Sequence, residues 1–350
     1  MDEARLNQFV SRILGDLGGA LSVPLVRIGD RLGLYRTLHE AGPMAADELA
    51  DKTGIAQRYA REWLSHQAAS GYLDYEPASC KFALPPEQAM VFAIVDSPVY
   101  LQGAFDLAVA MMENQTLVEP AFRTGKGVGW GHQAPCLFCT VGRFFRPTYH
   151  NNLVQSWLPA LDGVVAKLER GATVADVGCG HGFSTVIMAK AFPKSKFIGY
   201  DFHPSSIAQT RVHAEQHDVR ANTRFEVSLA SEFPGNDLDL VTFFDCLHDM
   251  GDPVGVARRV RQALKPDGTW MMVEPAAADR LEHNLNPVSR LYYAASTMVC
   301  VPTSLDQPVG AALGAQAGLA RLSAAIRKGG FGQVRKAAET PFNMVLEARA

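Results

Sequence analysis

A glycine-rich loop limits most strongly what this chain can fold into. The apolar run Thr173–Val177 reads as a buried strand, and it passes through Gly178–Gly182 (GCGHG) into a helix pattern at Ser184–Ala191. Glycines let the backbone turn sharply and approach a ligand without a Cβ in the way. The helix N-terminus that follows offers unpaired N–H groups and a partial positive charge. The residues assigned to ligand binding here are Asp176, Gly178, Cys179, Gly180 and Gly182.

The loop spacing indicates which ligand is expected. A pyrophosphate site has the pattern G-x-G-x-x-G, whereas this chain has G-x-G-x-G with Asp176 inside the strand. The site suits a ligand that carries a carboxylate and an ammonium group, such as a methionine moiety. Asp201 ends the next strand, Phe197–Tyr200, where a carboxylate accepts both hydroxyls of an unphosphorylated ribose. Together these features predict S-adenosylmethionine as the cofactor.

Strand-like and helix-like segments alternate over residues 166–350, which predicts an α/β fold with parallel strands and ligands at their carboxyl ends. Further strands are expected at Thr223–Val227, Leu238–Phe244 and Trp270–Glu274, with helices at Pro204–His217 and Val254–Leu264. A terminal strand pair is expected at Phe331–Ala337 and Phe342–Ala348, joined by a turn with Glu339, Thr340 and Pro341. Three residues that follow strand ends are also assigned to the cofactor site: Phe202, Ser228 and Asp245.

Residues 1–90 read as a winged-helix domain. Helices are expected at Arg27–Glu40, Ala45–Thr53 and Ile55–Ser70, followed by short strands at Tyr72–Tyr75 and Lys81–Leu84. The third helix carries Arg58 and Arg61 but also Glu62, which is little charge for neutralising DNA phosphates. Packing against a second copy of the domain is therefore favoured over DNA binding.

Residues 91–165 read as a helical connector, with a buried helix at Pro98–Met112. Phe145 and Tyr149 lie in an aromatic and arginine-rich stretch that can wall a small-molecule pocket, although packing between domains is the favoured alternative for each. The predicted organisation is a winged-helix domain (1–90), a connector or cap (91–165) and a cofactor-binding domain (166–350).

Composition limits the partners. There are 33 Lys and Arg against 36 Asp and Glu, a formal charge of −3, with no basic block for nucleic acid or a membrane surface. The longest apolar runs considered, Val91–Val95 and Phe105–Met112, are too short to span a bilayer. The first twenty residues lack a signal-peptide core, so we expect a cytoplasmic protein. A metal at Cys136 and Cys139 would need further ligands, for which only His132 and His150 are near, so ordinary thiols are favoured and no metal is predicted.

Two segments carry a family resemblance. VADVGCGHG resembles the first signature of class I S-adenosylmethionine-dependent methyltransferases, and FIGYDFHP resembles the second. Over nearly its whole length the chain is similar to small-molecule, caffeate-type O-methyltransferases with an N-terminal winged-helix dimerisation domain, and to a bacterial winged-helix group. The resemblance implies a Rossmann-like domain with a mostly parallel seven-stranded sheet and one antiparallel terminal strand, a homodimer, and S-adenosylhomocysteine as the product.

The resemblance also implies the catalytic residues. Phe243–Pro253 (FFDCLHDMGDP) is similar to the family segment whose histidine is the general base, which corresponds to His248. Histidine suits removal of a phenolic proton near neutral pH. Glu274 matches the first of two carboxylates that orient this histidine. The second position falls near Gln316, an amide, and Asp249 is an alternative.

The methyl acceptor stays open. Asn284–Ser304 follows the fifth strand and is expected to line the acceptor pocket with Arg290, Tyr293 and Met298, although core packing is an equal alternative for each. The favoured prediction is O-methylation of a small, aromatic or hydroxylated molecule. N-, C- or S-methylation without a strong base is one alternative, a regulator that senses S-adenosylmethionine is another, and a non-methylating reaction with the same cofactor is a third.

Overall fold

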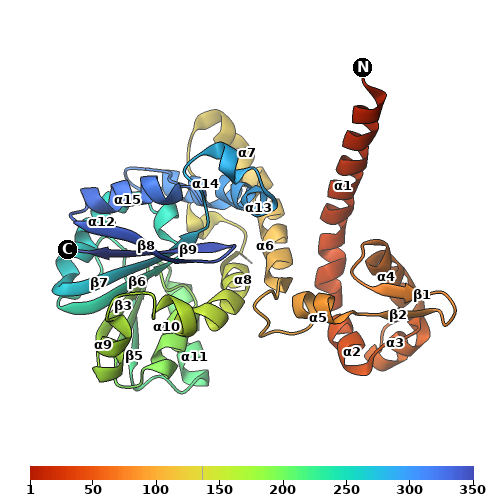
Figure 1. The fold of residues 1–350 in the computed structure, drawn as a ribbon, viewed down its shortest axis with the longest axis horizontal. Coiled ribbons are helices and arrows are strands. Elements are labelled where there is room, and N and C mark those ends of the chain that lie inside the picture. The colour runs from red at the N-terminus through yellow and green to blue at the C-terminus, as the bar shows by residue number, and fades with distance from the viewer. Residues whose placement is uncertain (136) are drawn as a thin grey trace. The chain divides into compact units, whose positions relative to one another are not determined.

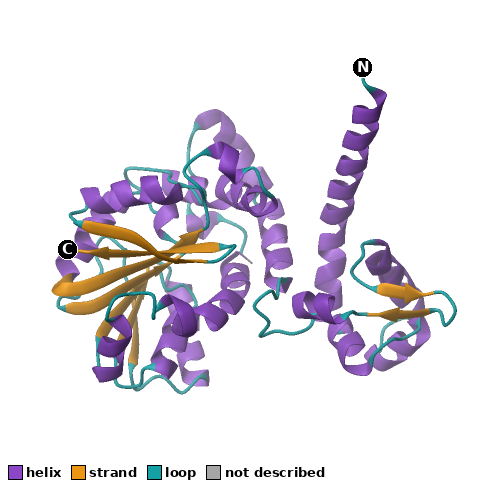
Figure 2. Ribbon diagram, in the orientation of Figure 1, coloured by secondary structure: helices purple, strands orange, loops and turns teal. Residues whose placement is uncertain are grey.

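The computed structural model describes residues 1–135 and 137–350, so Cys136 lies outside the described residues. The chain divides into two compact units. The first comprises residues 1–110 and 143–147, and the second comprises residues 111–142 and 148–350. Figures 1 and 2 show the mainly helical first unit and the sheet of the second. The segment predicted as a connector, 91–165, is divided between the two units.

The first unit contains the predicted winged helix. Its elements are α1 (Glu3–Arg31), α2 (Leu34–Ala41), α3 (Ala46–Thr53), α4 (Gln57–Ala69), β1 (Asp74–Glu76), β2 (Lys81–Ala83) and α5 (Pro86–Phe92). One helix was expected over Arg27–Glu40, and this was wrong. The chain breaks at Gly33, which has a left-handed backbone with φ +69°, so α1 ends before it and α2 begins after it.

The core of this unit is apolar and aromatic. Tyr35 packs edge-on against Trp63 and stacks on Phe92, with ring centroids 5.0 and 4.9 Å apart. An ion-pair network joins residues 143–147 and the segment around Asp106 to α1. The Arg143 guanidinium bonds Asp30 at 2.6 Å and Asp106 at 2.5 Å. These contacts explain why residues 143–147 belong to the first unit.

Helix α1 is much longer than predicted, and its N-terminal part extends beyond α2–α4 of its own unit (Figure 1). By length and composition alone, α1 could cross a membrane, which the estimate from short apolar runs did not anticipate. This helix contains Gly15, Gly18, Gly19 and Pro24, which are poor helix formers, so its full length was not predicted.

A seven-stranded sheet forms the centre of the second unit, in the order β5-β4-β3-β6-β7-β9-β8. Strands β3 to β7 are parallel, and β9 is antiparallel to both of its neighbours, as predicted. The bounds are β3 (Thr173–Val177), β4 (Lys196–Asp201), β5 (Thr223–Val227), β6 (Leu238–Phe244), β7 (Leu264–Pro275), β8 (Gln333–Glu339) and β9 (Asn343–Arg349). Strand β7 begins earlier than predicted because Leu264 pairs with Leu238. Glu339, expected in the turn, ends β8.

Helices and short helical turns complete the described chain. Before the sheet lie α6 (Gln102–Glu113), α7 (Gln115–Thr124), η1 (Trp130–His132), α8 (Leu137–Asn152), η2 (Leu153–Trp157) and α9 (Val164–Arg170). Between and after the strands lie α10 (Phe183–Ala191), α11 (Pro204–Gln216), η3 (Leu247–Asp249), α12 (Pro253–Ala263), η4 (Leu281–Asn284), α13 (Pro287–Ala295), η5 (Ser296–Cys300), α14 (Val301–Leu305) and α15 (Gly318–Lys328). The helix expected at Pro98–Met112 begins only at Gln102.

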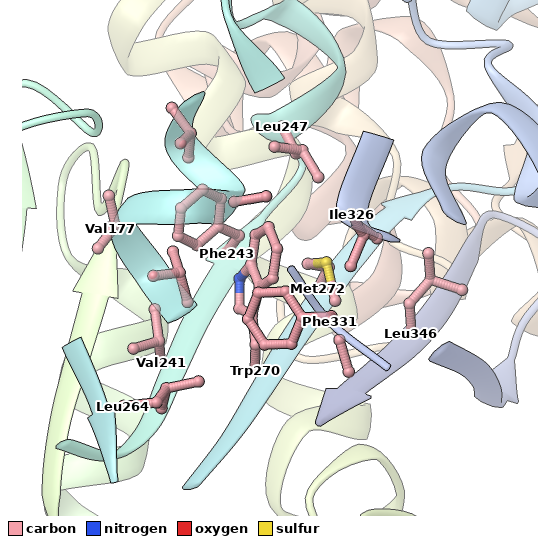
Figure 3. Close-up of a cluster of buried hydrophobic side chains, with 14 of the residues drawn as sticks. Val177, Val241, Phe243, Leu247, Leu264, Trp270, Met272, Ile326, Phe331 and Leu346 are labelled. Atoms are coloured by element: carbon pink, nitrogen blue, oxygen red, sulfur yellow. The ribbon is translucent and has the colours of Figure 1, made fainter. Parts of the chain in front are cut away.

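One hydrophobic core fixes the sheet edge on which the site is built. Trp270 of β7 packs edge-on against Phe243 of β6 and also against Phe331, with centroids 5.1 and 5.2 Å apart (Figure 3). Residues from β3, β6, β7 and β9 and from helices α12 and α15 share this core. Burial of such large side chains contributes about 1.5–3 kcal/mol each. This core therefore anchors the strands whose carboxyl ends carry the site residues.

Candidate active site

The glycine loop lies between β3 and α10 and presents its backbone. Gly178, Gly180 and Gly182 have φ values of +74°, +52° and +73°, a region that residues with a Cβ rarely adopt. A Cβ on Gly178 would lie 2.8 Å from Cys246 Sγ, and one on Gly182 would lie 2.3 Å from Thr210 Cγ2. At Gly180 the same direction is open space. The loop therefore needs glycine for its conformation, and Gly180 faces the room in which a ligand can lie.

Asp176 stabilises this loop through hydrogen bonds to the residues that follow it and to β6. Its Oδ2 accepts hydrogen bonds from Ser184 Oγ at 2.8 Å and from Thr185 Oγ1 at 2.5 Å, and its Oδ1 accepts one from Thr242 Oγ1 at 3.1 Å. Burial raises the pKa of Asp176 to about 6, although these hydroxyls oppose the rise. The carboxylate thus ties the first turn of α10 to the sheet, and direct contact with the cofactor stays a prediction.

Asp201 lies at the end of β4 beside the loop. Its Oδ2 accepts from the backbone N–H of Gly180 at 2.9 Å, and its Oδ1 accepts from that of His203 at 2.9 Å. Burial raises the pKa of Asp201, and the two backbone donors oppose this. A carboxylate has about four acceptor positions, so two remain for the hydroxyls of a ribose. The loop and the predicted ribose acid therefore lie in direct contact.

The other residues assigned to the cofactor differ in their surroundings. The Cys179 side chain is buried beside Gly199, so that residue can offer only its backbone to a ligand. Phe202 is 46% exposed next to Asp201. Ser228 is half-buried, and its N–H bonds the Asp201 carbonyl at 3.0 Å, which brings the end of β5 to the same edge. Their cofactor contacts stay predictions.

Asp245, also assigned to the cofactor, lies in a polar cluster with Tyr149. The Tyr149 hydroxyl donates to Asp245 Oδ2 and the Asn343 amide donates to Asp245 Oδ1, both at 2.9 Å. Asp245 has φ +51°, and burial raises its pKa well above the ordinary value, with Glu274 adding to the rise. Tyr149, which was assigned to the acceptor pocket, is therefore hydrogen-bonded to Asp245 at the end of β6.

The structure brings together the two residues assigned to catalysis. The Nδ1 atom of His248 lies 2.6 Å from Oε2 of Glu274, and both side chains are almost fully buried. Burial alone lowers the pKa of His248, but Glu274 and Cys300 outweigh it, and the pKa stands well above its usual range. A carboxylate that accepts from Nδ1–H directs Nε2 away from itself. Glu274 therefore stabilises the imidazolium that forms when His248 accepts a proton.

The second orienting position is not filled as the family pattern suggests. The Gln316 amide donates to the carbonyls of Ala276 and Ala315, and its Oε1 is buried without a partner among the described residues. Asp249 lies near enough to His248 to interact with its charge, and burial raises the pKa of Asp249 to about 7. The role of Asp249 as the second acid stays a prediction.

The predicted acceptor residues do not form one group. Phe145 belongs to the first unit, where its ring meets that of Phe144 at 4.9 Å. Arg290 is exposed and Tyr293 is 36% exposed on α13. Met298 lines a largely apolar cavity of about 310 Å³ with Val118 and Phe122 of α7. Gln115, Glu119 and Arg123 also line this cavity, and the contact of Met298 with an acceptor stays a prediction.

Several residues at this edge were not predicted from the sequence, namely Ser184, Thr185, Thr210, Thr242, Cys246 and Asn343. Ser184 and Thr185 follow the glycine loop directly and could have been identified as partners for Asp176. Asn343 gave no such signal. Cys139 is exposed, and no group of three or more His, Cys, Asp or Glu within residues 1–135 and 137–350 is arranged to hold a metal ion.

Comparisons with known proteins agree with this architecture. Residues 168–324 match the family model described as a methyltransferase domain, and residues 19–93 match the Rv2258c-like winged HTH domain. Ubiquinone biosynthesis O-methyltransferase of Xanthomonas campestris pv. campestris (strain B100) is 34% identical over 115 residues, which is 32% of this chain and 47% of that protein. The Pseudomonas paraeruginosa (strain DSM 24068 / PA7) protein of the same name is 31% identical over 127 residues, 35% of this chain and 51% of that protein. The chain thus spans about half the length of the curated relatives it matches.

Solved structures show the same fold over the whole chain. Mitomycin 7-O-methyltransferase MmcR superposes with a TM-score of 0.70 at 22% identity and covers 100% of both chains. Human N-acetylserotonin methyltransferase, solved with S-adenosylmethionine, gives a TM-score of 0.68 at 17% identity over 97% of both chains. The chain therefore joins an N-terminal winged HTH domain to a methyltransferase domain.

Proposed function

We propose that this protein transfers a methyl group from S-adenosylmethionine to a hydroxyl group of a small aromatic molecule, with His248 as the general base. The observation that carries the proposal is the 2.6 Å contact between His248 and Glu274 at the strand ends that also carry the glycine loop and Asp201. Methyl transfer needs two reactants held in line, and a phenol must also lose its proton. An amine that is already uncharged has a free lone pair and does not need a buried carboxylate–histidine pair to remove a proton.

Each residue has a distinct part in this proposal. The cofactor, when bound, supplies an electrophilic methyl group on a sulfonium. The backbone of Gly178–Gly182 would bind its methionine portion, and Asp201 would bind the ribose hydroxyls. His248 would take the acceptor proton at Nε2 while Glu274 stabilises the resulting imidazolium. The apolar cavity beside Met298 is the best-suited place for the aromatic part of the acceptor.

We also propose that the protein is a cytoplasmic homodimer formed through the first unit. Large apolar side chains are exposed along α1, and such a stripe is typical of a helix that packs against a partner. The alternative of DNA binding is weakened because Arg58 of α4 is paired with Glu62 of the same helix. A charge engaged in that way contributes less to phosphate neutralisation.

The experiment is mass spectrometry of reactions with S-adenosylmethionine and a panel of phenols and hydroxylated aromatic compounds. Wild-type protein is expected to add one methyl group to at least one of them, and His248→Ala should lower the rate by about a hundredfold or more. Full activity of His248→Ala would exclude the base role. Methylation of amines or thiols alone would favour the alternative acceptor chemistry.

The cofactor site is tested separately by isothermal titration with S-adenosylhomocysteine. Asp201→Ala removes two charge-assisted hydrogen bonds, so affinity should fall by about tenfold or more. Glu232→Ala, an exposed acid after β5, serves as the control and should bind as wild type does. Equal affinity of Asp201→Ala and wild type would contradict the ribose assignment.

A further inference from the structure

The second ring nitrogen of His248 is also in contact with a protein atom. Nε2 lies 3.3 Å from Sγ of Cys300, while Nδ1 is bound to Glu274. Both nitrogens of the proposed base are therefore engaged before any acceptor is present. For His248 to take a proton from an acceptor hydroxyl, that hydroxyl must reach Nε2 from the place where the sulfur lies.

The position of the sulfur is fixed by the fold. Cys300 ends η5, a π-helical turn, and such turns occur frequently at functional sites. Both ends of the turn are held by long-range hydrogen bonds. Ser296 Oγ accepts from the N–H of Ala315 at 3.1 Å, and the Val299 carbonyl accepts from the Gln133 amide at 3.4 Å. These hydrogen bonds fix the turn, and the turn places Cys300 next to His248.

The backbone of His248 is braced as well. Its carbonyl accepts from the N–H of Gly314 at 3.0 Å, and Glu274 Oε1 accepts from the N–H of Leu247 at 2.9 Å. Gly314 has φ +73°, and a Cβ there would lie 2.6 Å from Ser296 Oγ. The same glycine therefore allows η5 and His248 to approach each other closely.

A thiol suits a temporary partner. It is a weak hydrogen-bond donor and a weak acceptor, so it can face Nε2 in either protonation state and can be replaced at small cost. A carboxylate at this position would hold the ring as an imidazolium, because an opposite charge favours the charged form. A hydroxyl of an acceptor is the stronger donor and can displace the sulfur.

We propose that Cys300 is a positioning residue, whose thiol keeps Nε2 of His248 aligned and shielded until an acceptor hydroxyl takes its place. This inference rests on the proposed function, because it assumes that His248 is the base. It adds the location of the acceptor oxygen, which is the position of Sγ in the structure without acceptor.

The test uses phenol as the probe and the protein saturated with S-adenosylhomocysteine. Phenol is titrated while the Nε2 resonance of His248 is followed by nitrogen-15 NMR, and the signal is assigned by its loss in His248→Ala. Wild type should show a saturable shift. Cys300→Ala should bind phenol about fivefold more tightly, because no thiol has to be displaced, and Cys300→Ser should bind it about fivefold more weakly, because a hydroxyl is the stronger competitor.

The order of the three dissociation constants decides the outcome. Cys80→Ser, a change at an exposed thiol in the other unit, is the control and should behave as wild type. Equal constants in all variants, weaker binding to Cys300→Ala, or no shift in wild type and Cys300→Ala overturns the proposal. Failure to bind S-adenosylhomocysteine would contradict the proposed function instead, and the phenol titration repeated without it would still decide the role of Cys300.

Discussion

Oε2 of Glu274 lies 2.6 Å from Nδ1 of His248, and both side chains are buried at the carboxyl ends of the strands. The second oxygen of Glu274 accepts from the N–H of Leu247, so the carboxylate cannot rotate freely. Glu274 is the next-to-last residue of β7 and His248 follows β6, and these strands are paired neighbours in the sheet. The geometry of the proposed base is therefore a direct consequence of strand pairing.

Replacing Glu274 by Gln should change the pH profile of methyl transfer. The carboxylate raises the pKa of His248, so wild-type activity should rise with pH above neutrality as His248 loses its proton. Without the negative charge the pKa falls, and the rising limb should move to lower pH while the maximal rate drops by about tenfold or more. The measurement is kcat against pH with the best phenol found. An unmoved limb would show that another group controls the profile.

Two glycine substitutions should separate stability from ligand binding. Gly182→Ala places a Cβ 2.3 Å from Thr210 Cγ2, whereas Gly180→Ala meets open space, and both carry the cost of positive φ, about 1–2 kcal/mol. Gly182→Ala should therefore lower the melting temperature more. Gly180→Ala should bind S-adenosylhomocysteine at least tenfold more weakly because its methyl group occupies ligand space.

Thermal denaturation and calorimetric titration of both variants provide the measurements. Gly163→Ala is a suitable control because Gly163 also has positive φ, +70°, and open space around it, but lies at the start of α9 outside the site. If Gly180→Ala binds S-adenosylhomocysteine as well as Gly163→Ala does, the open side of the loop is not the cofactor site.

The arrangement of the glycine loop and Asp201 could be predicted from the sequence because these residues lie close together along the chain. Strand β3 has the predicted bounds, the three loop glycines have the positive φ that their pattern indicated, and Asp201 reaches Gly180 only 21 positions away. The alternation of strand-like and helix-like segments located β3, β4, β5 and β6 within one residue of their bounds, whereas β7 begins six residues earlier than predicted. The antiparallel β9 was also predicted from the terminal apolar pair.

The remaining part of the site depends on contacts between distant segments. Cys300 meets His248 across 52 positions, and Asn343 meets Asp245 across 98. Neither residue type nor spacing indicates such contacts, because they arise from a π-helical turn and from the pairing of β7 with β9. The length of α1 was not predicted for a different reason. Its glycines and proline lower the local helix propensity. Packing of residues near the C-terminal end of α1 outweighs this effect in the folded protein.

Asp249 should make the stability of the protein depend on pH. Its pKa is raised to about 7 by burial, from an ordinary value of 3.8, so the folded state binds this proton more tightly than the unfolded state. The stabilisation is complete below about pH 4 and is lost as the pH rises to 7. Asp249→Asn should flatten this fall and raise the melting temperature at pH 8 by about 2–4 °C. The control is Asp51→Asn, a change at an exposed position. If the melting temperature falls with pH equally in both variants, Asp249 is not the group that makes the stability depend on pH.

The exposed apolar side chains along α1 predict that the protein forms a dimer through this helix. Leu14, Leu17 and Leu21 are 63%, 56% and 70% exposed and follow one another at three- and four-residue spacing, so they lie along one face of the helix. If this face packs against a second copy, wild type should be a dimer, and Leu17→Asp combined with Leu21→Asp should give a folded monomer. Light scattering after size exclusion measures the mass, and circular dichroism checks the fold.

The control for this pair is Leu281→Asp, which alters an equally exposed leucine, 62%, outside α1 and should leave the dimer intact. A competing explanation of the apolar stripe is a lipid surface, since α1 is long enough to cross a bilayer. Cosedimentation with neutral phosphatidylcholine vesicles distinguishes the two. A monomeric wild type that sediments with the vesicles, and a double variant that does not, would replace the second copy with a membrane as the partner of α1.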